Sequence, residues 1–170
     1  MLFTKTGLEG AWLVEPTPAR DARGWFARTF CEQEFAAHGL ETRFVQHSTS
    51  HNVERGTLRG MHFQTAPYAE VKLVRCLKGA ILDVIVDLNP GSPTYRRWRG
   101  FELSAANMRQ LYIPRGFAHG FQTLEHECEI GYLTSDFYAP AASTGVRWDD
   151  PAFSIEWPLP VTVMNDKDRA

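Results

Sequence analysis

The sequence has none of the features that mark a membrane-spanning or exported protein. No apolar run approaches the roughly 20 residues of a membrane helix, and the N-terminal stretch MLFTKTGLEGAW lacks the apolar core that a signal peptide needs. Charge of one sign is not in excess either. The net charge of −2 and the isoelectric point near 6.3 argue against a general binder of nucleic acids or membrane surfaces. We therefore expect a cytoplasmic protein with no nucleic-acid and no membrane partner.

Cysteine is scarce, and its spacing argues against a disulfide framework. Cys31, Cys76 and Cys128 are far apart, odd in number and form no CxxC pair. This pattern is typical of reduced core thiols in a cytosolic protein.

Length and composition predict a single domain that spans residues 1–170. Hydrophobic residues make up 44% of the chain and charged residues 22%, which suits a protein that buries a substantial core. No internal repeat, low-complexity segment or linker divides the sequence. Because the net charge is so small, any anionic ligand must be bound by a local cluster of Arg and Lys.

Long helical periodicity is nearly absent, and short strand-like segments separated by turn signals fill the chain instead. The expected strands are Ala11–Glu15, Gly24–Phe30, Phe44–Thr49, Gly56–Gln64, Val71–Leu77, Ile81–Leu88, Trp98–Leu103, Arg109–Ile113, Gly120–Leu124 and Glu129–Thr134. One short helix is expected over Glu32–His38, while PTPARDARG and Ser50–Arg55 are expected to be turns or loops. The Pro- and Trp-rich remainder from Tyr138 to Ala170 should wrap the body. The spacing predicts an all-β sandwich or barrel.

The stretch from Gly56 to Cys76 is the first candidate for a functional site. It places Arg59, His62 and Lys72 among apolar residues that favour strands. A buried Lys or His is costly unless it is paired or used. In a regular strand Arg59 and His62 would face opposite ways, so for both to reach one cavity we expect a bulge at Gly60.

Motifs in this stretch and beyond it resemble a known family. The matching segments are Arg23–Phe26, Thr57–Gln64, Lys72–Cys76, Asp83–Leu88, Gly91–Tyr95, Leu111–Leu124, Tyr138–Pro140, Arg147–Pro158 and Asn165–Asp168. In order and at near-constant spacing they resemble the dTDP-4-dehydrorhamnose 3,5-epimerase family of sugar-nucleotide epimerases. The resemblance implies an all-β, cupin-type jelly-roll β-barrel with a short helix and an irregular C-terminal segment. It also implies a homodimer that uses no metal and no organic cofactor.

The resemblance implies that the enzyme inverts C3 and/or C5 of a nucleoside-diphosphate 4-keto-6-deoxy hexose. A carbon next to a ketone can lose a proton, and such an epimerase needs a base, an acid on the opposite face and a donor at the ketone oxygen. His62 matches the family's base and Asp168 the carboxylate that orients it. Lys72 matches the group that stabilises the enolate oxygen, and Tyr132 matches the acid.

The same resemblance assigns residues that contact the nucleotide part of the substrate. These are Arg23, Gln46, Arg59, His119, Lys167 and Tyr138. An Arg side chain suits a diphosphate because its planar fork bonds phosphate oxygens in pairs. Tyr138 matches the residue that stacks on the base. The N-terminal strands are expected to pair across the dimer and to carry Arg23 into the neighbouring site.

The chain departs from the family pattern at three places. One extra residue lies between Gln46 and the His62 motif, Arg28 replaces a common Glu, and Ser143 replaces another. The two replacements shift the local charge by about three units toward positive. Because these positions contact the nucleotide in the family, the sequence does not identify the nucleobase or the exact sugar. Relatives often continue beyond the position of Ala170, so a C-terminal segment is expected in a longer form.

Three other functions stay open at this point. A metal-dependent cupin usually carries an HxH pair, a Glu and a later His. Here Gln64 stands at the second His of the pair, which leaves His62, Glu70 and His119 as a 2-His-1-carboxylate set. A non-catalytic sugar-nucleotide binder would have no need of an acid and a base together. A mono-epimerase acting on a different 4-keto sugar shares the fold and the base, and side-chain identity does not exclude it.

Overall fold

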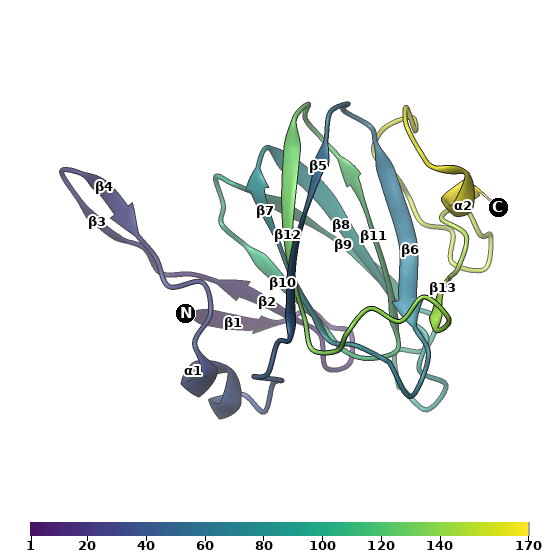
Figure 1. Cartoon of the computed structure of the whole chain (residues 1–170), viewed down its shortest axis with the longest axis horizontal. Helices are drawn as coiled ribbons and strands as arrows, with labels where there is room; N and C mark the ends of the chain where they lie inside the picture. Colours follow the sequence, from purple (N-terminus) through teal and green to yellow (C-terminus); the bar gives the residue numbers. More distant parts are fainter. Residues whose placement is uncertain (170) are drawn as a thin grey trace.

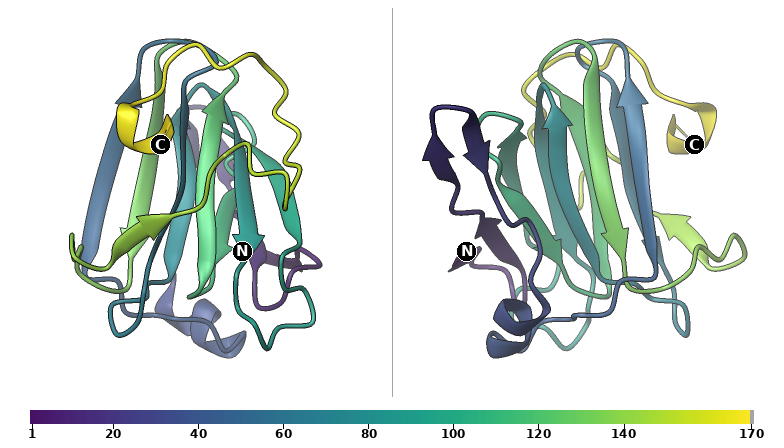
Figure 2. Two further views of the ribbon diagram at one scale, coloured as in Figure 1. Left: turned by 90° about the vertical axis from the view of Figure 1, so that its right-hand side faces the viewer. Right: turned by 60° about the vertical axis from the view of Figure 1, so that its left-hand side comes forward.

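The computed structural model describes residues 1–169, in which two large antiparallel sheets face each other and a third, two-stranded sheet is separate (Figures 1 and 2). The six-stranded sheet has the order β1-β2-β10-β7-β12-β5, and the five-stranded sheet has the order β13-β6-β11-β8-β9. The strands are β1 (Leu2–Lys5), β2 (Trp12–Glu15), β3 (Ala19–Asp21), β4 (Gly24–Phe26), β5 (Gln46–Asn52), β6 (Leu58–Gln64), β7 (Lys72–Lys78), β8 (Ala80–Asp87), β9 (Trp98–Ser104), β10 (Gln110–Ile113), β11 (Phe117–Thr123), β12 (Cys128–Thr134) and β13 (Ser143–Gly145). The helices are α1 (Glu32–Ala37) and α2 (Asp166–Arg169). None of the helices described is long and apolar enough to cross a membrane.

Eight of the strands pair as nested antiparallel couples. β5 pairs with β12, β6 with β11, β7 with β10 and β8 with β9. From β5 to β12, successive strands alternate between the two sheets except at the β8–β9 hairpin, which is the connectivity of a jelly roll. The expected all-β jelly-roll fold is therefore confirmed, with a short helix near the N-terminus.

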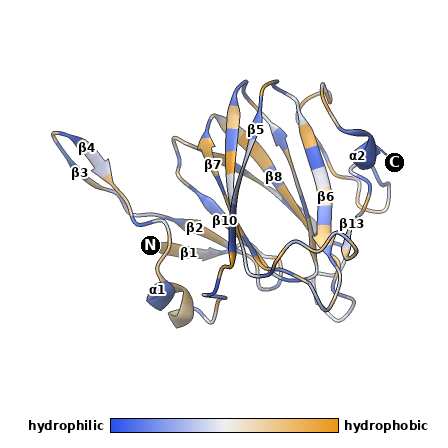
Figure 3. Ribbon diagram, viewed as in Figure 1, coloured by the Kyte–Doolittle hydropathy of each residue, from blue (hydrophilic) through white to orange (hydrophobic). Residues whose placement is uncertain are grey.

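The main core lies between the two sheets. Ile81 and Ile85 of β8 point into it, together with Leu111 of β10 and Ile130 of β12. On the other face of β8, Val84 and Val86 are also fully buried. A strand buried on both faces reads as a continuous apolar run, and β8 accordingly appears hydrophobic along most of its length (Figure 3).

Irregular segments cover the outer faces of both sheets. The C-terminal segment packs Val146, Phe153 and Trp157 against the outer face of the five-stranded sheet. The expectation that this segment wraps the body is confirmed. α1 buries Phe35 against the outer face of the six-stranded sheet.

Several local predictions differ from the structure. Part of the expected turn PTPARDARG is β3, which pairs with β4 in a hairpin, and the strand expected over Gly24–Phe30 ends at Phe26. Ser50 lies inside β5 rather than in a loop, because pairing with β12 extends that strand to Asn52. Short strands β1 and β13, which carry little periodicity, were not expected. Cys76 and Cys128 are buried free thiols, whereas Cys31 is only partly buried.

The β3–β4 hairpin, which we call the arm, stands away from the two sheets (Figure 1). Its aromatic side chains Trp25 and Phe26 are 54% and 75% exposed. Neighbouring exposed aromatic residues are a feature of surfaces that bind a partner.

The bulge expected at Gly60 is present. Arg59 pairs with Phe121 and His62 with His119, so β6 advances three residues where β11 advances two. Gly60 has φ +137°, and a Cβ atom there would lie 2.5 Å from the Cα atom of Gly120. Only glycine adopts this backbone at such close approach. As a result Arg59 and His62 line the same cavity.

We expect Gly60→Ala to lower the free energy of unfolding by about 2–5 kcal/mol, because both the backbone angle and the contact with Gly120 become unfavourable. Urea unfolding would measure the loss. Gly91→Ala is the control, since a Cβ there meets nothing within 4 Å, and it should change stability by less than about 0.5 kcal/mol. Equal stability of the two variants would contradict the bulge.

Candidate active site

A cavity of about 380 Å³ opens between the two sheets, and we call it the main cavity. The five-stranded sheet supplies Arg59, His62 and His119, and the six-stranded sheet supplies Lys72 and Tyr132. The loops and the C-terminal segment supply Tyr138, Asn165 and Asp168. Of the ten site residues predicted from the sequence, the structure brings eight to this cavity: Gln46, Arg59, His62, Lys72, His119, Tyr132, Tyr138 and Asp168.

His62 and Asp168 form a close pair. His62 Nε2 lies 2.7 Å from Asp168 Oδ1, and the Asp168 side chain is almost fully buried. The second oxygen of Asp168 accepts a hydrogen bond from the Gly60 N–H at 3.2 Å. Asn165 Oδ1 accepts from the Asp168 N–H at 2.7 Å and fixes the start of α2. An ionised Asp168 can only accept, so His62 carries its proton on Nε2 and leaves Nδ1 free to act as a base.

Burial lowers the pKa of His62 below its ordinary value, and Asp168 opposes this shift by hydrogen bonding and by its charge. Lys72 and His119 lower the pKa further. The net direction is down, so the neutral imidazole predominates at neutral pH. A neutral imidazole is the form that accepts a proton.

Lys72 is partly buried and is held by two acceptors. Its Nζ atom lies 3.2 Å from Glu70 Oε1 and donates to the His62 carbonyl at 3.3 Å. Glu70 thus supplies the counter-ion that a Lys at this depth requires. The ammonium group is a fixed positive charge beside His62.

Tyr132 faces the cavity from the opposite sheet to His62. Its hydroxyl lies 2.9 Å from Ser50 Oγ. Burial raises the pKa of Tyr132 well above its ordinary value, Ser50 lowers it in part, and the charge of Asp83 raises it again. Tyr132 is therefore protonated at neutral pH and can donate. A base and a donor occupy opposite walls of one cavity.

His119 is buried behind the edge of Tyr132 and pairs with Asp83. The His119 Nε2 atom lies 2.7 Å from Asp83 Oδ1, and the two rings of His119 and Tyr132 are 6.4 Å apart. Asp83 is fully buried, and its Oδ2 atom has no hydrogen-bond partner in residues 1–169. His119 therefore brings an imidazole to the wall of the cavity, with Asp83 buried behind it.

Arg59, Gln46 and Tyr138 line the cavity beyond these groups. Arg59 Nε donates to Asn52 Oδ1 at 2.7 Å, which fixes the guanidinium plane. Gln46 Oε1 accepts from the backbone N–H of Tyr138 at 2.7 Å. The Tyr138 ring is exposed, so a flat ligand group can reach it.

Two predicted residues lie outside the main cavity. Lys167 lines two smaller adjoining cavities that share His62 and Asp168 with it. Arg23 lies at the tip of the arm, where its side chain is 91% exposed and pairs with Asp21. Within one chain, Arg23 takes no part in the site.

The two charge departures also lie apart. Ser143 lines one of the smaller cavities with Tyr138 and Lys167. Arg28 is exposed, and its Nη1 atom lies 4.0 Å from Oε1 of Glu34 in α1. It lines none of the five cavities described for residues 1–169.

The groups of the metal-cupin alternative line the main cavity, but each is bonded to another partner. His62 is paired with Asp168, and Glu70 is paired with Lys72. Gln64 Nε2 donates to Glu70 Oε2 at 2.6 Å, and Gln64 Oε1 accepts from the Ala139 N–H. His119 is paired with Asp83 instead. Within residues 1–169, no three His, Cys, Asp or Glu side chains are grouped to hold a metal ion.

The sequence reasoning missed Ser50 and Asn165, and it gave Glu70 no role beside Lys72. Glu70 had a usable signal, because a Lys expected at a buried strand needs a nearby anion. Ser50 had no such signal in the sequence, because it belongs to a strand only through the pairing of β5 with β12.

Comparison with known proteins gives consistent matches over the whole chain. A model of the dTDP-4-dehydrorhamnose 3,5-epimerase family matches residues 5–170. The chain is 46% identical to the dTDP-4-dehydrorhamnose 3,5-epimerase of Methanothermobacter thermautotrophicus, covering 98% of this chain and 91% of that protein. It is 38% identical to a dTDP-4-dehydrorhamnose 3-epimerase of Streptomyces niveus, covering 99% of this chain and 82% of that protein. The structure also resembles the crystal structure of the Bacillus anthracis 3,5-epimerase with TDP and PPi bound, with a TM-score of 0.96 and 42% identity over 99% of this chain and 96% of that one.

We expect Asp168→Asn to lower the pKa of His62 further, because both effects of Asp168 on this pKa raise it. Titration of the His62 ring protons by NMR would measure the change. Asp166→Asn, an exposed neighbour on α2, should leave the pKa of His62 where it is. A rise in the pKa of His62 in Asp168→Asn would contradict the pairing.

Proposed function

The chain belongs to the dTDP-4-dehydrorhamnose 3,5-epimerase family and is an isomerase, and we propose that it inverts C3 and C5 of a dTDP-linked 4-keto-6-deoxy hexose. One observation carries the proposal. A His–Asp pair and a protonated Tyr lie on opposite walls of one cavity with a Lys ammonium beside the His. Epimerisation next to a ketone requires this arrangement of base, acid and positive charge.

The proposed steps follow from the positions of the four side chains. His62 Nδ1 takes the proton from the carbon next to the ketone, and the electron pair of the broken C–H bond moves onto the ketone oxygen. Lys72 stabilises the resulting enolate, a contribution typically worth about 2.7–4 kcal/mol at the transition state. Tyr132 donates its proton to the same carbon from the opposite wall. Asp168 stabilises the imidazolium form of His62 meanwhile.

The nucleotide is proposed to extend from these groups toward Arg59 and Tyr138. Arg59 and His119 would bind diphosphate oxygens, and Lys167 would reach them from the adjoining cavity. Gln46 holds the backbone of Tyr138, on whose ring the base would stack. Such stacking is typically worth about 1–3 kcal/mol per base. The Bacillus anthracis relative, crystallised with TDP and PPi, supports a nucleotide ligand.

The arm supplies the argument for a homodimer. Arg23 is a predicted substrate contact but lies far out on the arm, beside two exposed aromatic residues. A second chain would bury Trp25 and Phe26 and receive Arg23 in its site. We include in the proposal a single domain over residues 1–170, a cytoplasmic location and catalysis without cofactor.

The first test uses dTDP-4-keto-6-deoxyglucose in D2O, with deuterium at C3 and C5 followed by NMR. We expect exchange at both carbons, and His62→Ala should slow it about 10²–10⁴-fold because the base is lost. Exchange at a single carbon would make the protein a mono-epimerase, like the 3-epimerase relative. No exchange by folded protein, also with CDP- and GDP-linked ketosugars, would contradict the proposed reaction.

The second test asks whether Arg23 acts in the partner's site. We expect Arg23→Ala and His62→Ala each to be strongly impaired, and a co-refolded equal mixture to recover about a quarter of wild-type activity. About half of randomly formed dimers are mixed, and each mixed dimer has one complete site of two.

Asp168→Asn mixed with His62→Ala is the control for this test. Both residues belong to the same site of the same chain, so no complete site forms in a mixed dimer and activity should stay low. Activity in the test mixture no higher than in the control mixture would refute the crossing arm.

A further inference from the structure

Two buried side chains that the proposed mechanism does not use link the two ends of the main cavity. Gln64 ends β6 and is 4% exposed, and Glu70 lies just before β7 with a nearly buried side chain. Gln64 bonds to the backbone on both sides of Tyr138, at the end of the cavity where the nucleotide is proposed to bind. Glu70 pairs with Lys72, at the end where the sugar is proposed to bind.

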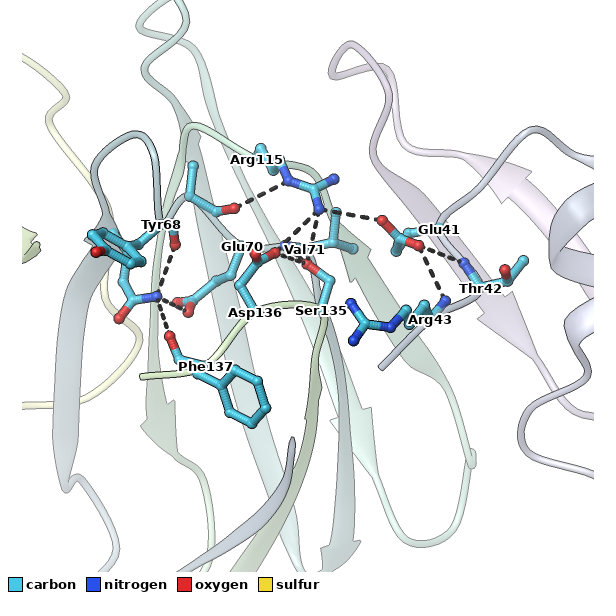
Figure 4. A network of polar contacts seen from close by, with 12 residues as sticks. Glu41, Thr42, Arg43, Tyr68, Glu70, Val71, Arg115, Ser135, Asp136 and Phe137 are labelled. Carbon is cyan, nitrogen blue, oxygen red and sulfur yellow. Dashed lines mark hydrogen bonds and ion pairs between the residues drawn. The ribbon is translucent and has the colours of Figure 1, made fainter. Parts of the chain in front are cut away.

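Gln64 holds the backbone on both sides of Tyr138. Its Nε2 atom lies 3.2 Å from the Phe137 carbonyl and 2.9 Å from the Tyr68 carbonyl, and its Oε1 accepts from the Ala139 N–H at 2.6 Å. Gln46 accepts from the Tyr138 N–H itself. Figure 4 shows Tyr68, Glu70 and Phe137 gathered around the same amide nitrogen. The amide has two N–H donors for these three acceptors, and the Phe137 carbonyl is the farthest of them. The two glutamines therefore hold Tyr138 and Ala139 directly and Phe137 more weakly.

Glu70 connects this amide to the ammonium group of Lys72. Its Oε2 accepts from Gln64 Nε2 at 2.6 Å, and its Oε1 lies 3.2 Å from Lys72 Nζ. An ammonium group has three N–H donors. Glu70 and the His62 carbonyl engage two of them in the described part of the chain, which leaves one for a ligand oxygen.

Arg115 braces the loops that carry these groups (Figure 4). Its Nε donates to the Ala69 carbonyl at 3.0 Å, and its Nη2 lies 3.1 Å from Asp136 and 3.2 Å from Ser135 Oγ. The Val71 N–H donates to the same Ser135 oxygen at 2.9 Å. These bonds join the loop before β7 to the loop after β12. A displacement of one loop would therefore strain the bonds to the other.

We propose that Gln64 and Glu70 are positioning residues for the reaction described above, on which this inference rests. Gln64 holds the Tyr138 loop where the nucleobase stacks, and Glu70 holds the Lys72 ammonium at the enolate oxygen. Because the two side chains are bonded to each other, binding at the nucleotide end stabilises the arrangement at the sugar end.

The test compares Gln64→Leu with a matched substitution elsewhere in the barrel. Gln122 is also fully buried, and both of its amide atoms bond to the backbone of Leu159, away from Tyr138 and Lys72. Gln122→Leu therefore removes a similar buried amide. We expect Gln64→Leu, but not Gln122→Leu, to speed amide hydrogen exchange of residues 137–139 about 10-fold in the free protein.

Calorimetry with dTDP then asks whether Gln64 acts through Tyr138. Gln64→Leu should weaken dTDP about 10-fold in the wild-type background and leave it unchanged in the Tyr138→Ala background. A loss that persists without Tyr138, or amide exchange no faster than in Gln122→Leu, would overturn the role of Gln64.

Glu70→Gln tests the second half of the link. The amide can still bond Gln64 but removes the negative charge beside Lys72, so kcat should fall about 10-fold with dTDP affinity within about twofold. An unchanged kcat would overturn the role of Glu70. Wild-type protein that binds dTDP without exchanging deuterium would refute the proposed reaction instead, while amide exchange and dTDP affinity would still decide the role of Gln64.

Discussion

One carboxylate holds the candidate site together. Asp168 accepts from the Gly60 N–H with one oxygen and bonds His62 Nε2 with the other. The first bond exists because the bulge in β6 turns that N–H out of the ladder with β11. The same bulge brings Arg59 and His62 to one side of the strand. A glycine at position 60 thus determines both which way His62 points and which carboxylate orients it.

The jelly roll places groups of opposite role on different sheets. His62 stands on β6 of the five-stranded sheet, and Tyr132 stands on β12 of the six-stranded sheet. The space between the sheets admits a ligand only where polar side chains interrupt the apolar core. Those polar groups are stabilised in pairs, His62 with Asp168, Lys72 with Glu70 and His119 with Asp83. Each pair reduces the cost of burying its charges. The remaining donors and acceptors of these side chains face the cavity.

The sequence predicts the fold and the bulge for physical reasons that can be named, and the family resemblance predicts most of the residues that line the main cavity. Alternating apolar strands and turn residues predict an all-β fold, and the parity of Arg59 and His62 requires the bulge. The sequence predicts a turn where β3 lies and a strand where β4 lies, because β3 has only three residues and pairs with no described strand other than β4. Ser50 was placed in a loop because its strand is set by pairing with β12, which lies about 80 residues away in sequence.

The residues that could not be predicted are those whose role depends on tertiary neighbours. The need of Lys72 for an anion could have indicated Glu70, but the bond between Glu70 and Gln64 depends on how the two strands are packed. Arg23 is the opposite case, since its family motif is clear but the structure places it on the exposed arm, outside the main cavity. Sequence identifies the chemical groups, and the packing of loops decides which of them meet.

The bond between His62 and Asp168 also joins parts of the chain that are 106 residues apart. Closing a loop of that length costs more conformational entropy than closing the turns between neighbouring strands. We therefore expect the barrel strands to associate before α2 docks against β6. A folding chain would pass through a stage with a formed barrel and an unoriented base, so the acquisition of secondary structure should precede the acquisition of catalytic competence.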